Sequence, residues 1–261
     1  MKKFVVRILL PLLLIAISGY VWFYFGGRTS NPRNCQTIGD IPVPFGYRRV
    51  ACDNAAFGTF LRSLPLEKKG AKVMLYTGDT ANYQFLSYAV VDLPILSNAE
   101  QCADACMRLR AEYLFRQGKY GEIRFNDVNG KTLTYTGGSS RKAFEKYLKQ
   151  VYDVANTFSL SRELRQRPLA EVQAGDVFVY AAADRPGNRY GHAVMVVDVA
   201  RHPRSGKKVL LLAEGNTPAR SIHVMQNSGH PFLSPWFELD EKAGKLRFSV
   251  FRFLPDELRH F

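Results

Sequence analysis

The sequence has few cysteines and lacks the residue spacings that usually bind zinc or nucleotides. Four cysteines in 261 residues are too few to build a disulfide-based scaffold. Cys102 and His192 have no CxxC or HxxxH companions, so a structural zinc site has little support. The glycines Gly137 and Gly138 lack the lysine spacing of a phosphate-binding P-loop. We therefore expect neither a metal nor a cofactor.

Nucleic-acid binding is also not indicated, although the formal net charge is +13. Lysine and arginine are spread along the chain, and no basic run is interleaved with aromatic residues in the manner of nucleic-acid contacts. Hydrophobic residues make up 46% of the chain, which excludes a mostly disordered protein. The basic exterior predicts an anionic partner, such as acidic membrane lipid or a cell-wall polymer.

The N-terminal segment is apolar from Phe4 to Phe25 and follows two lysines. A bilayer core needs roughly 20 apolar residues, and aromatic residues gather at the far end of this run, as they do at a headgroup layer. A cleaved signal peptide is the alternative, with Ala16-Ile17-Ser18 as a weak cleavage site. We expect residues 1–27 to be an uncleaved transmembrane signal anchor. This predicts a single-pass inner (cytoplasmic) membrane protein with its folded domain on the extracytoplasmic, periplasmic side.

After the apolar run, the sequence predicts a linker and one folded domain. Residues 28–48 contain three prolines, which indicate a linker, and residues 49–261 form the domain. The strongest helical patterns come first, and strand-like runs follow from Asp176 onward. The helices are expected at 55–64, 97–117 and 141–158, and the strands at 72–76, 88–93, 176–181, 192–199, 209–213 and 246–253. This order indicates the α+β class, with a helical N-terminal half and an antiparallel sheet in the C-terminal half.

The expected helix at 97–117 carries two cysteines. Ser97 and Glu100 have capping-box spacing, so we expect the helix to begin there. Cys102 then falls in the second turn, where the positive end of the helix dipole favours a thiolate. A thiolate beside a histidine is what a cysteine hydrolase needs, whereas two small buried core residues are the simpler interpretation of Cys102 and Cys106.

The other two cysteines flank a proline-rich loop. If the domain lies outside the cytoplasm, Cys35 and Cys52 can form a disulfide that closes this loop, worth about 3 kcal/mol. Two unpaired thiols are the alternative.

A histidine opens one of the expected strands, directly after Gly191. The next strand ends at Glu214-Gly215-Asn216, so an antiparallel pair can bring Glu214 or Asn216 toward His192. Either side chain could orient the imidazole, as the third member of a catalytic triad does. A half-buried structural histidine and a solvated loop carboxylate are the alternatives. We expect His223 to be an exposed loop residue.

The order of these residues resembles the papain-like cysteine hydrolases, including the NlpC-type cell-wall peptidases. A helix-borne cysteine comes first, then a strand-borne histidine after a glycine, then a polar residue at the end of the next strand. The segment Leu169–Phe178 also looks like the strand entry that precedes the histidine strand in NlpC-type domains. The resemblance implies a papain-like fold, in which the cysteine helix packs on an antiparallel sheet that carries the histidine.

A second resemblance covers nearly the whole part after the apolar run. The motifs QCADA followed by MRLRAEYL, then GDVF and GHAV, are similar to those of a bacterial family catalogued only as a domain of unknown function. This resemblance implies that Gln101-Cys102 and Gly191-His192 are signature positions, which favours Cys102 as nucleophile. The papain pattern favours Cys106 instead, because its oxyanion glutamine lies several residues before the cysteine. The papain-like flank G-x-C-W is absent.

We therefore expect a membrane-anchored thiol hydrolase, a peptidase or amidase, that acts on amide bonds in cell-envelope material. Cys102, His192 and Glu214 are the expected catalytic residues, and Cys106, Asn216 and Gln101 are second choices. The substrate partner would be a cell-wall peptide or another envelope component. A catalytically inactive envelope-binding module on the same scaffold is the alternative.

Overall fold

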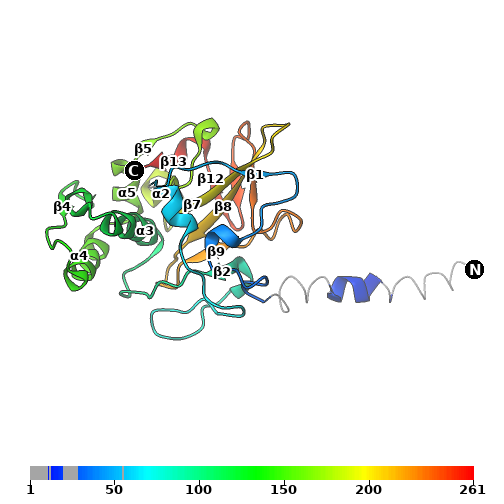
Figure 1. Ribbon diagram of the computed structural model, residues 1–261, viewed down its shortest axis with the longest axis horizontal. Helices are drawn as coiled ribbons and strands as arrows, with labels where there is room; N and C mark the ends of the chain where they lie inside the picture. The colour runs from blue at the N-terminus through cyan, green and yellow to red at the C-terminus, as the bar shows by residue number, and fades with distance from the viewer. Residues whose placement is uncertain (1–10, 12, 20–28, 55) are drawn as a thin grey trace, which may run out of the picture.

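A nine-stranded sheet organises the chain in the computed structural model, which describes residues 11, 13–19, 29–54 and 56–261 (Figure 1). The main path has the order β2-β9-β8-β7-β6-β13-β5, with β1 added to β7 and β10 added to β8. Each of these pairings is antiparallel. The strands of this sheet are β1 (Arg48–Arg49), β2 (Ser87–Val90), β5 (Arg165–Gln166), β6 (Val177–Tyr180), β7 (His192–Arg201), β8 (Lys208–Glu214), β9 (His223–Met225), β10 (Phe237–Leu239) and β13 (Leu258–His260).

Helices α3, α4 and α5 gather on one side of the molecule, while α2 lies in front of β7 (Figure 1). The α-helices of the folded part are α2 (Phe57–Arg62), α3 (Cys102–Arg116), α4 (Arg141–Val154) and α5 (Thr157–Glu163). Short 3-10 helices are η2 (Ile38–Asp40), η3 (Gln84–Leu86), η4 (Tyr120–Glu122), η5 (Leu169–Glu171), η6 (Ala182–Asp184) and η7 (Pro255–Glu257). Two hairpins lie outside the large sheet: β3 (Arg124–Asn126) with β4 (Thr132–Thr134), and β11 (Leu246–Phe248) with β12 (Phe251–Phe253).

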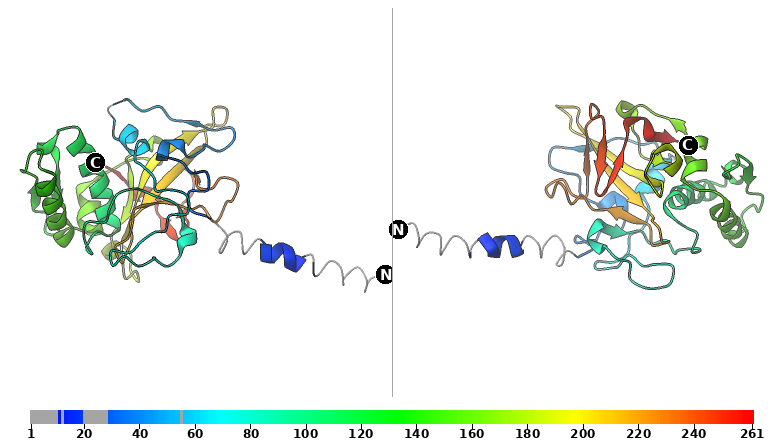
Figure 2. Two further views of the ribbon diagram at one scale, coloured as in Figure 1. Left: turned by 60° about the horizontal axis from the view of Figure 1, so that its bottom comes forward. Right: turned by 180° about the vertical axis from the view of Figure 1, so that it is seen from behind.

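The central strand β7 is covered on both of its faces. Its alternating side chains Ala193, Met195 and Val197 belong to the larger core, which includes α3. Val194 and Val196 point to the opposite face and join a second core with the β11–β12 hairpin. The view from behind shows this hairpin lying over the sheet (Figure 2). A strand buried on both faces is almost uniformly apolar, which explains the sequence HAVMVVDVA.

The predicted fold class is wrong in its division of the chain. The described N-terminal half is not helical: it has only α2 and α3 as α-helices, and its strands β1 and β2 pair with β7 and β9 of the C-terminal half. The molecule is therefore mostly antiparallel sheet with few helices, not a helical half followed by a β half. The sequence pattern could not show this, because short strands such as β1 are defined only by their partner strand.

The proline-rich segment 28–48 was expected to be a linker. From residue 29 onward it packs into the larger core instead, and Ile38 and Ile41 are fully buried. The backbone of Ile38 donates a hydrogen bond to the Leu64 carbonyl, and β1 follows directly. The segment therefore covers the sheet as part of the domain.

The expected membrane anchor is also corrected. Among the described residues, no helix combines the length and the apolar character needed to cross a bilayer. This finding contradicts the predicted transmembrane helix and the predicted inner-membrane location. Most of the expected span, namely residues 1–10, 12 and 20–27, lies outside the described residues.

Candidate active site

Three neighbouring strands bring two histidines and a glutamate together at one end of the sheet. His192 opens β7, Glu214 ends β8 and His223 opens β9, where it pairs directly with Glu214. His192 Nε2 lies 2.6 Å from Glu214 Oε2. The three residues are each 4% exposed or less, so this contact is shielded from water.

His223 gives Glu214 a second imidazole partner. Its Nδ1 lies 3.1 Å from the Ser221 carbonyl, which can only accept, so this nitrogen donates. Its Nε2 faces Glu214 Oε1 at 3.5 Å. The ring of His223 therefore lies between a carbonyl and a carboxylate, with one of them at each nitrogen. The expectation of an exposed loop histidine is wrong, because His223 is a buried strand residue.

The thiol of Cys102 adjoins the other ring of this cluster. Cys102 is the first residue of α3, and its side chain lies close enough to His192 to raise the pKa of the imidazole. Since Nε2 of His192 faces Glu214, Nδ1 is the nitrogen left for the sulfur. The structure therefore brings Cys102, His192 and Glu214 together in a row, with His223 at the far end.

Burial and hydrogen bonding have opposite effects on the pKa values of His192 and Glu214. Burial alone would lower the pKa of His192, but its hydrogen bonds with Cys102 and Glu214 outweigh that effect and raise the pKa to about 9. Burial alone would raise the pKa of Glu214, but hydrogen bonds from His192 and His223 lower it to about 2. A protonated His192 beside an ionised Glu214 is thus the favoured state at neutral pH.

An aromatic side chain fixes the plane of the imidazole. The ring of Phe251, from β12, stacks on His192 with centroids 3.6 Å apart and an angle of 15° between the planes. A stacked ring limits rotation of the histidine and excludes water from that side. Sequence reasoning missed Phe251, since nothing in its local pattern shows which strand the hairpin will cover.

Two glycines let the elements that carry the site approach closely. A Cβ on Gly191 would lie 2.6 Å from the Tyr180 carbonyl oxygen, and one on Gly215 would lie 3.0 Å from Ala105 Cβ. Both approaches leave no room for a side chain. The lack of a side chain at Gly215 therefore allows the end of β8 to pack closely against the start of α3, where Cys102 lies.

The second-choice residues occupy different positions around the site. Cys106 is 1% exposed, and burial raises its pKa well above that of a free thiol. Gln101 is the N-cap residue of α3, and its Oε1 accepts a hydrogen bond from Thr217 Oγ1 at 2.8 Å. Asn216 is half-buried, and its side chain accepts a hydrogen bond from the Thr217 backbone. Glu214, not Asn216, contacts His192.

The expected disulfide is not formed in this structure. Cys35 and Cys52 are both free thiols. Cys35 is buried with its Sγ 3.5 Å from the Asp40 carbonyl, whereas the Cys52 Sγ lies where a Cβ on Gly58 would meet it. The two sulfurs contact different parts of the domain because the segment between them follows the sheet through β1.

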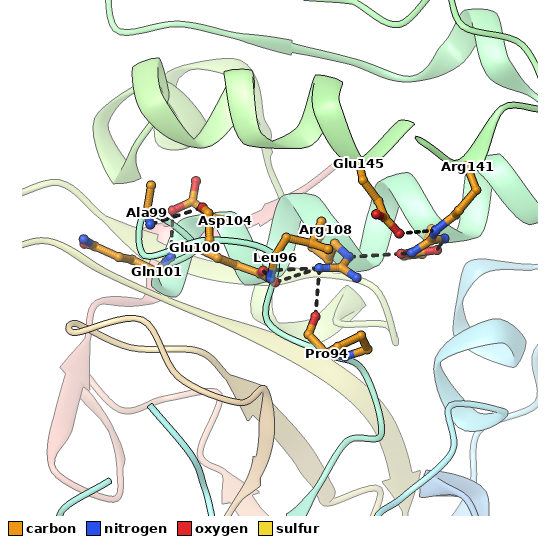
Figure 3. A network of polar contacts seen from close by, with 11 residues as sticks. Pro94, Leu96, Ala99, Glu100, Gln101, Asp104, Arg108, Arg141 and Glu145 are labelled. Carbon is orange, nitrogen blue, oxygen red and sulfur yellow. Dashed lines mark hydrogen bonds and ion pairs between the residues drawn. The ribbon is translucent and has the colours of Figure 1, made fainter. Parts of the chain in front are cut away.

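Helix α3 begins later than its sequence predicts. Glu100 does not cap it, because its carboxylate binds the guanidinium of Arg108 and the backbone of Leu96 (Figure 3). Arg108 is fully buried and also binds Glu112, which in turn pairs with Arg141. Arg108 and its partners therefore form a buried ion-pair network behind the cysteine.

A pocket of about 420 Å³ opens beside the nucleophile candidate. Its lining joins the start of α3 to the corner between α4 and α5 and to the loop before β7. The lining includes Gln101, Cys102 and Asp104, six alanines, Phe158, Arg189, Tyr190, Gly191 and Thr217. The site thus has a substrate-sized space on the side of the sulfur.

Within the described part of the chain, no group of three or more histidine, cysteine, aspartate or glutamate side chains is placed to hold a metal ion. The site itself contains a thiol, an imidazolium and a buried carboxylate next to a pocket.

These features define a mostly antiparallel sheet protein with few helices and with a buried cysteine–histidine–glutamate row at the end of its sheet. A family model described as "Domain of unknown function (4846)" matches residues 39–138 and 136–260. The chain belongs to this family. No curated protein and no solved structure matches the chain.

Proposed function

We propose that the protein is a thiol hydrolase, a peptidase or amidase, that cleaves amide bonds with Cys102 as its nucleophile. The observation that carries this proposal is the row Cys102–His192–Glu214, in which the thiol meets an imidazole that a buried carboxylate holds at 2.6 Å. The order of these residues along the chain is also that of papain-like hydrolases. A nucleophile, a base and an orienting carboxylate are the parts that acyl transfer requires.

The first half of the reaction transfers an acyl group to sulfur. In the reactive state the proton of the Cys102 thiol lies on His192, and the Cys102 thiolate forms a bond to the carbonyl carbon of the substrate. The tetrahedral intermediate then breaks its carbon–nitrogen bond, and the leaving amine takes the proton from His192. In the second half, the neutral His192 accepts a proton from water, whose oxygen attacks the thioester. The carbon–sulfur bond then breaks, the acid product leaves, and the thiolate beside the protonated His192 is regenerated.

Gln101 supports the oxyanion in this proposal. Thr217 Oγ1 donates to Gln101 Oε1, which leaves the amide NH₂ group of Gln101 free to donate. The first N–H groups of α3 also have no partner inside the helix. Side-chain and backbone donors therefore converge near the Cys102 sulfur, as an oxyanion hole requires.

Glu214 and His223 act through His192. Glu214 keeps the imidazole protonated and fixes its orientation, while His223 holds the second oxygen of the same carboxylate. Cys106 is not assigned the nucleophile role, because it is enclosed and its thiol resists ionisation.

Site-resolved alkylation tests the nucleophile without a known substrate. The full chain is treated with iodoacetamide at pH 6, and the modified cysteines are counted by peptide mass spectrometry. Cys52 is an internal reference, because it is more exposed than the other three thiols and burial still raises its pKa. We expect Cys102 to react about 10²-fold faster than Cys52, because ordinary thiols are almost fully protonated at this pH.

The matched variants are Cys102→Ala and Cys106→Ala. The first should abolish the fast reaction and any release of new amines from peptides, with cell-wall peptides as the first natural substrates to try. The second should preserve both. Equal slow labelling of Cys102 and Cys52 would contradict a hydrolase and favour a non-catalytic binding module on the same scaffold.

A further inference from the structure

A second pocket, of about 660 Å³, lies where the later turns of α3 meet the β3–β4 hairpin, the end of α5 and the paired strands β5 and β13. The C-terminus is close to these elements (Figure 1). The pocket shares no lining residue with the one beside Cys102. Three arginines from three elements line it, namely Arg110 on α3, Arg124 on β3 and Arg165 on β5. We call this space the arginine pocket.

Aromatic rings hold the guanidinium of Arg110 in place. Its Cζ lies 5.3 Å from the ring centroids of Phe57 and Tyr113 and 5.5 Å from that of Phe261. Within the described residues, this half-buried guanidinium forms neither a hydrogen bond nor an ion pair. Burial lowers the pKa of Arg110, because no carboxylate lies close enough to replace the lost hydration. Arginine nevertheless stays charged in proteins, so a cation without an acceptor faces the pocket.

The other half-buried arginines in the described part of the chain all have acceptors. Each donates a hydrogen bond to a carboxylate or a backbone carbonyl; they are Arg49, Arg62, Arg167, Arg185, Arg220 and Arg259. The fully buried Arg108 binds two carboxylates. Arg110 is therefore an exception in a protein that otherwise pairs its enclosed cations. An enclosed polar group without a partner needs an explanation, and a ligand in the pocket supplies one.

The acids in the lining do not use the donors of Arg110. Glu122 pairs with Lys119 at 3.4 Å. Glu163 is half-buried, and its Oε2 accepts a hydrogen bond from the Asn126 backbone at 2.8 Å. Neither carboxylate forms an ion pair with Arg110, so its donors stay available to a ligand.

The other two arginines add to the charge of the same space. Arg124 and Arg165 are exposed, and among the described residues neither forms an ion pair. Arg124 does lie near enough to Glu163 to oppose the effect of burial on the pKa of that acid. His260 also lines the pocket, and its Nδ1 lies 3.1 Å from the backbone oxygen of Phe261. Three guanidinium groups thus face one pocket without a carboxylate bound to any of them.

We propose that the arginine pocket binds a small organic oxyanion with at least two negative charges, such as a phosphate ester or a polycarboxylate. A guanidinium presents paired N–H donors that match two oxygens of a phosphate or carboxylate group. Three such groups offer more donors than a single carboxylate can accept, which favours the higher charge. The volume of about 660 Å³ lies within the range of small-molecule sites, about 300–1,000 Å³. This inference does not depend on the proposed hydrolase function.

Calorimetric titration of the full chain tests the site, with pyrophosphate and citrate as separate probes at pH 7 and physiological salt. We expect saturable binding of at least one probe to one site per chain. Tighter binding of pyrophosphate would identify a phosphate ligand, and tighter binding of citrate a polycarboxylate. Absence of saturable binding for both probes would overturn the proposal.

Matched arginine variants separate this site from general attraction to a basic protein. Arg110→Gln should weaken binding at least about tenfold, the effect of losing a hydrogen bond to a charged group. Arg110→Lys should restore little of it, because an ammonium group lacks the paired donors. Arg116→Gln removes the same charge from an exposed arginine on α3 that contacts Phe60 and lies outside the lining, so it should leave binding unchanged. An equal loss in the Arg110 and Arg116 variants would overturn the proposal.

A double variant covers the case in which Arg110→Gln does not fold. Arg124→Gln combined with Arg165→Gln changes only exposed side chains, so the fold should persist while binding weakens at least about tenfold. Full retention of binding in this folded variant would place the anion elsewhere. Alkylation of Cys102 gives an independent readout of the proposed hydrolase. The bound anion should not slow this reaction, because the two pockets share no lining residue; protection of Cys102 would show that the probe binds in the other pocket.

Discussion

Helix α3 contacts two clusters of buried charge, and they differ in what lies next to them. Arg108 binds Glu100 (Figure 3) and also binds Glu112, which gives a buried ion-pair network on the helix. The second cluster joins His192, Glu214 and His223 at the start of the same helix. The pocket is lined by Cys102 and Asp104 but not by Arg108.

This difference shows that buried charge alone does not mark an active site. In the Arg108 network each carboxylate binds an arginine, and burial still raises the pKa of Glu100 while the two arginines lower that of Glu112. Such a network fixes the position of the helix. The histidine cluster, in contrast, lies beside the Cys102 thiol and a pocket, so its charged groups are close to a place where a ligand can bind.

Removing the charge of Glu214 should have the largest effect on reactivity. Glu214→Gln eliminates the carboxylate that keeps His192 protonated, so the rate of Cys102 alkylation or hydrolysis should fall about 10²- to 10⁴-fold. The alkaline limit of hydrolysis should also move down from about pH 9 toward the ordinary histidine value, because the leaving amine then loses its proton donor. The measurements are the alkylation rate at pH 6 and the pH profile of amine release. An unchanged profile would show that the two clusters are equivalent structural networks.

Breaking the Arg108 network should lower the stability of the fold and leave the reactivity of Cys102 unchanged. Arg108→Leu leaves Glu100 and Glu112 buried without their shared cation, which should cost about 3–5 kcal/mol of unfolding free energy. Urea titration measures this loss. In the folded fraction, Cys102 should still react faster than Cys52. Loss of that selectivity at full folding would mean that the Arg108 network also positions the nucleophile.

The contribution of the histidine cluster to the unfolding free energy should depend on pH. The pKa of His192 is raised above its unfolded value, so its contribution is complete below about pH 6.5 and is lost as pH rises through about 9. The pKa of Glu214 is lowered, so its contribution is complete above about pH 4.5 and is lost as pH falls through about 2. The difference in unfolding free energy between the parent chain and Glu214→Gln should therefore shrink from pH 6.5 to 9.

The matched control for this titration is Glu122→Gln. Glu122 is exposed and forms an i,i+3 pair with Lys119, so its removal should change stability by less than about 1 kcal/mol. Its small effect should not vary over the same alkaline range. A difference for Glu214→Gln that grows with pH would contradict the assigned ion pair.

His223 should have the smallest effect of these changes. It touches Glu214 at 3.5 Å and does not reach the sulfur, so His223→Asn should reduce the alkylation rate only about three- to tenfold. The alkaline limit of hydrolysis should hardly move, because Glu214 keeps its contact with His192 at 2.6 Å. A loss as large as that of Glu214→Gln would place His223 among the essential groups.

Much of the local structure could be predicted from the sequence, because long apolar or amphipathic runs have few alternatives. The strand at 192–199 is observed as β7, and the helix at 141–158 as α4 followed by α5. The run at 246–253 was expected to be one strand but forms a hairpin, since Ser249 has a φ of 55° that turns the chain. Single residues of this kind are hard to recognise in advance.

The candidate site could be predicted only in part. His192 and Glu214 were paired from the ends of adjacent strands, and their contact follows from the antiparallel register of β7 and β8. His223 and Phe251 were missed because β9 and β12 reach the site through long-range pairing and packing. Glu100 was expected to cap α3, but a fully buried guanidinium attracts it more strongly than an exposed backbone group would.

The sequence by itself determined the periodicity of the main helices and strands and the residue types available for thiol chemistry, because these depend on neighbours a few positions away. Tertiary structure alone decided that β1 and β2 join the sheet, that segment 29–48 belongs to the core and that Asp104 is buried with one oxygen unpartnered. These properties depend on burial and on partners far along the chain. In both the Arg108 network and the cysteine–histidine row, polar groups are removed from water. This burial explains the close ion pairs of the first and the shifted pKa values of the second.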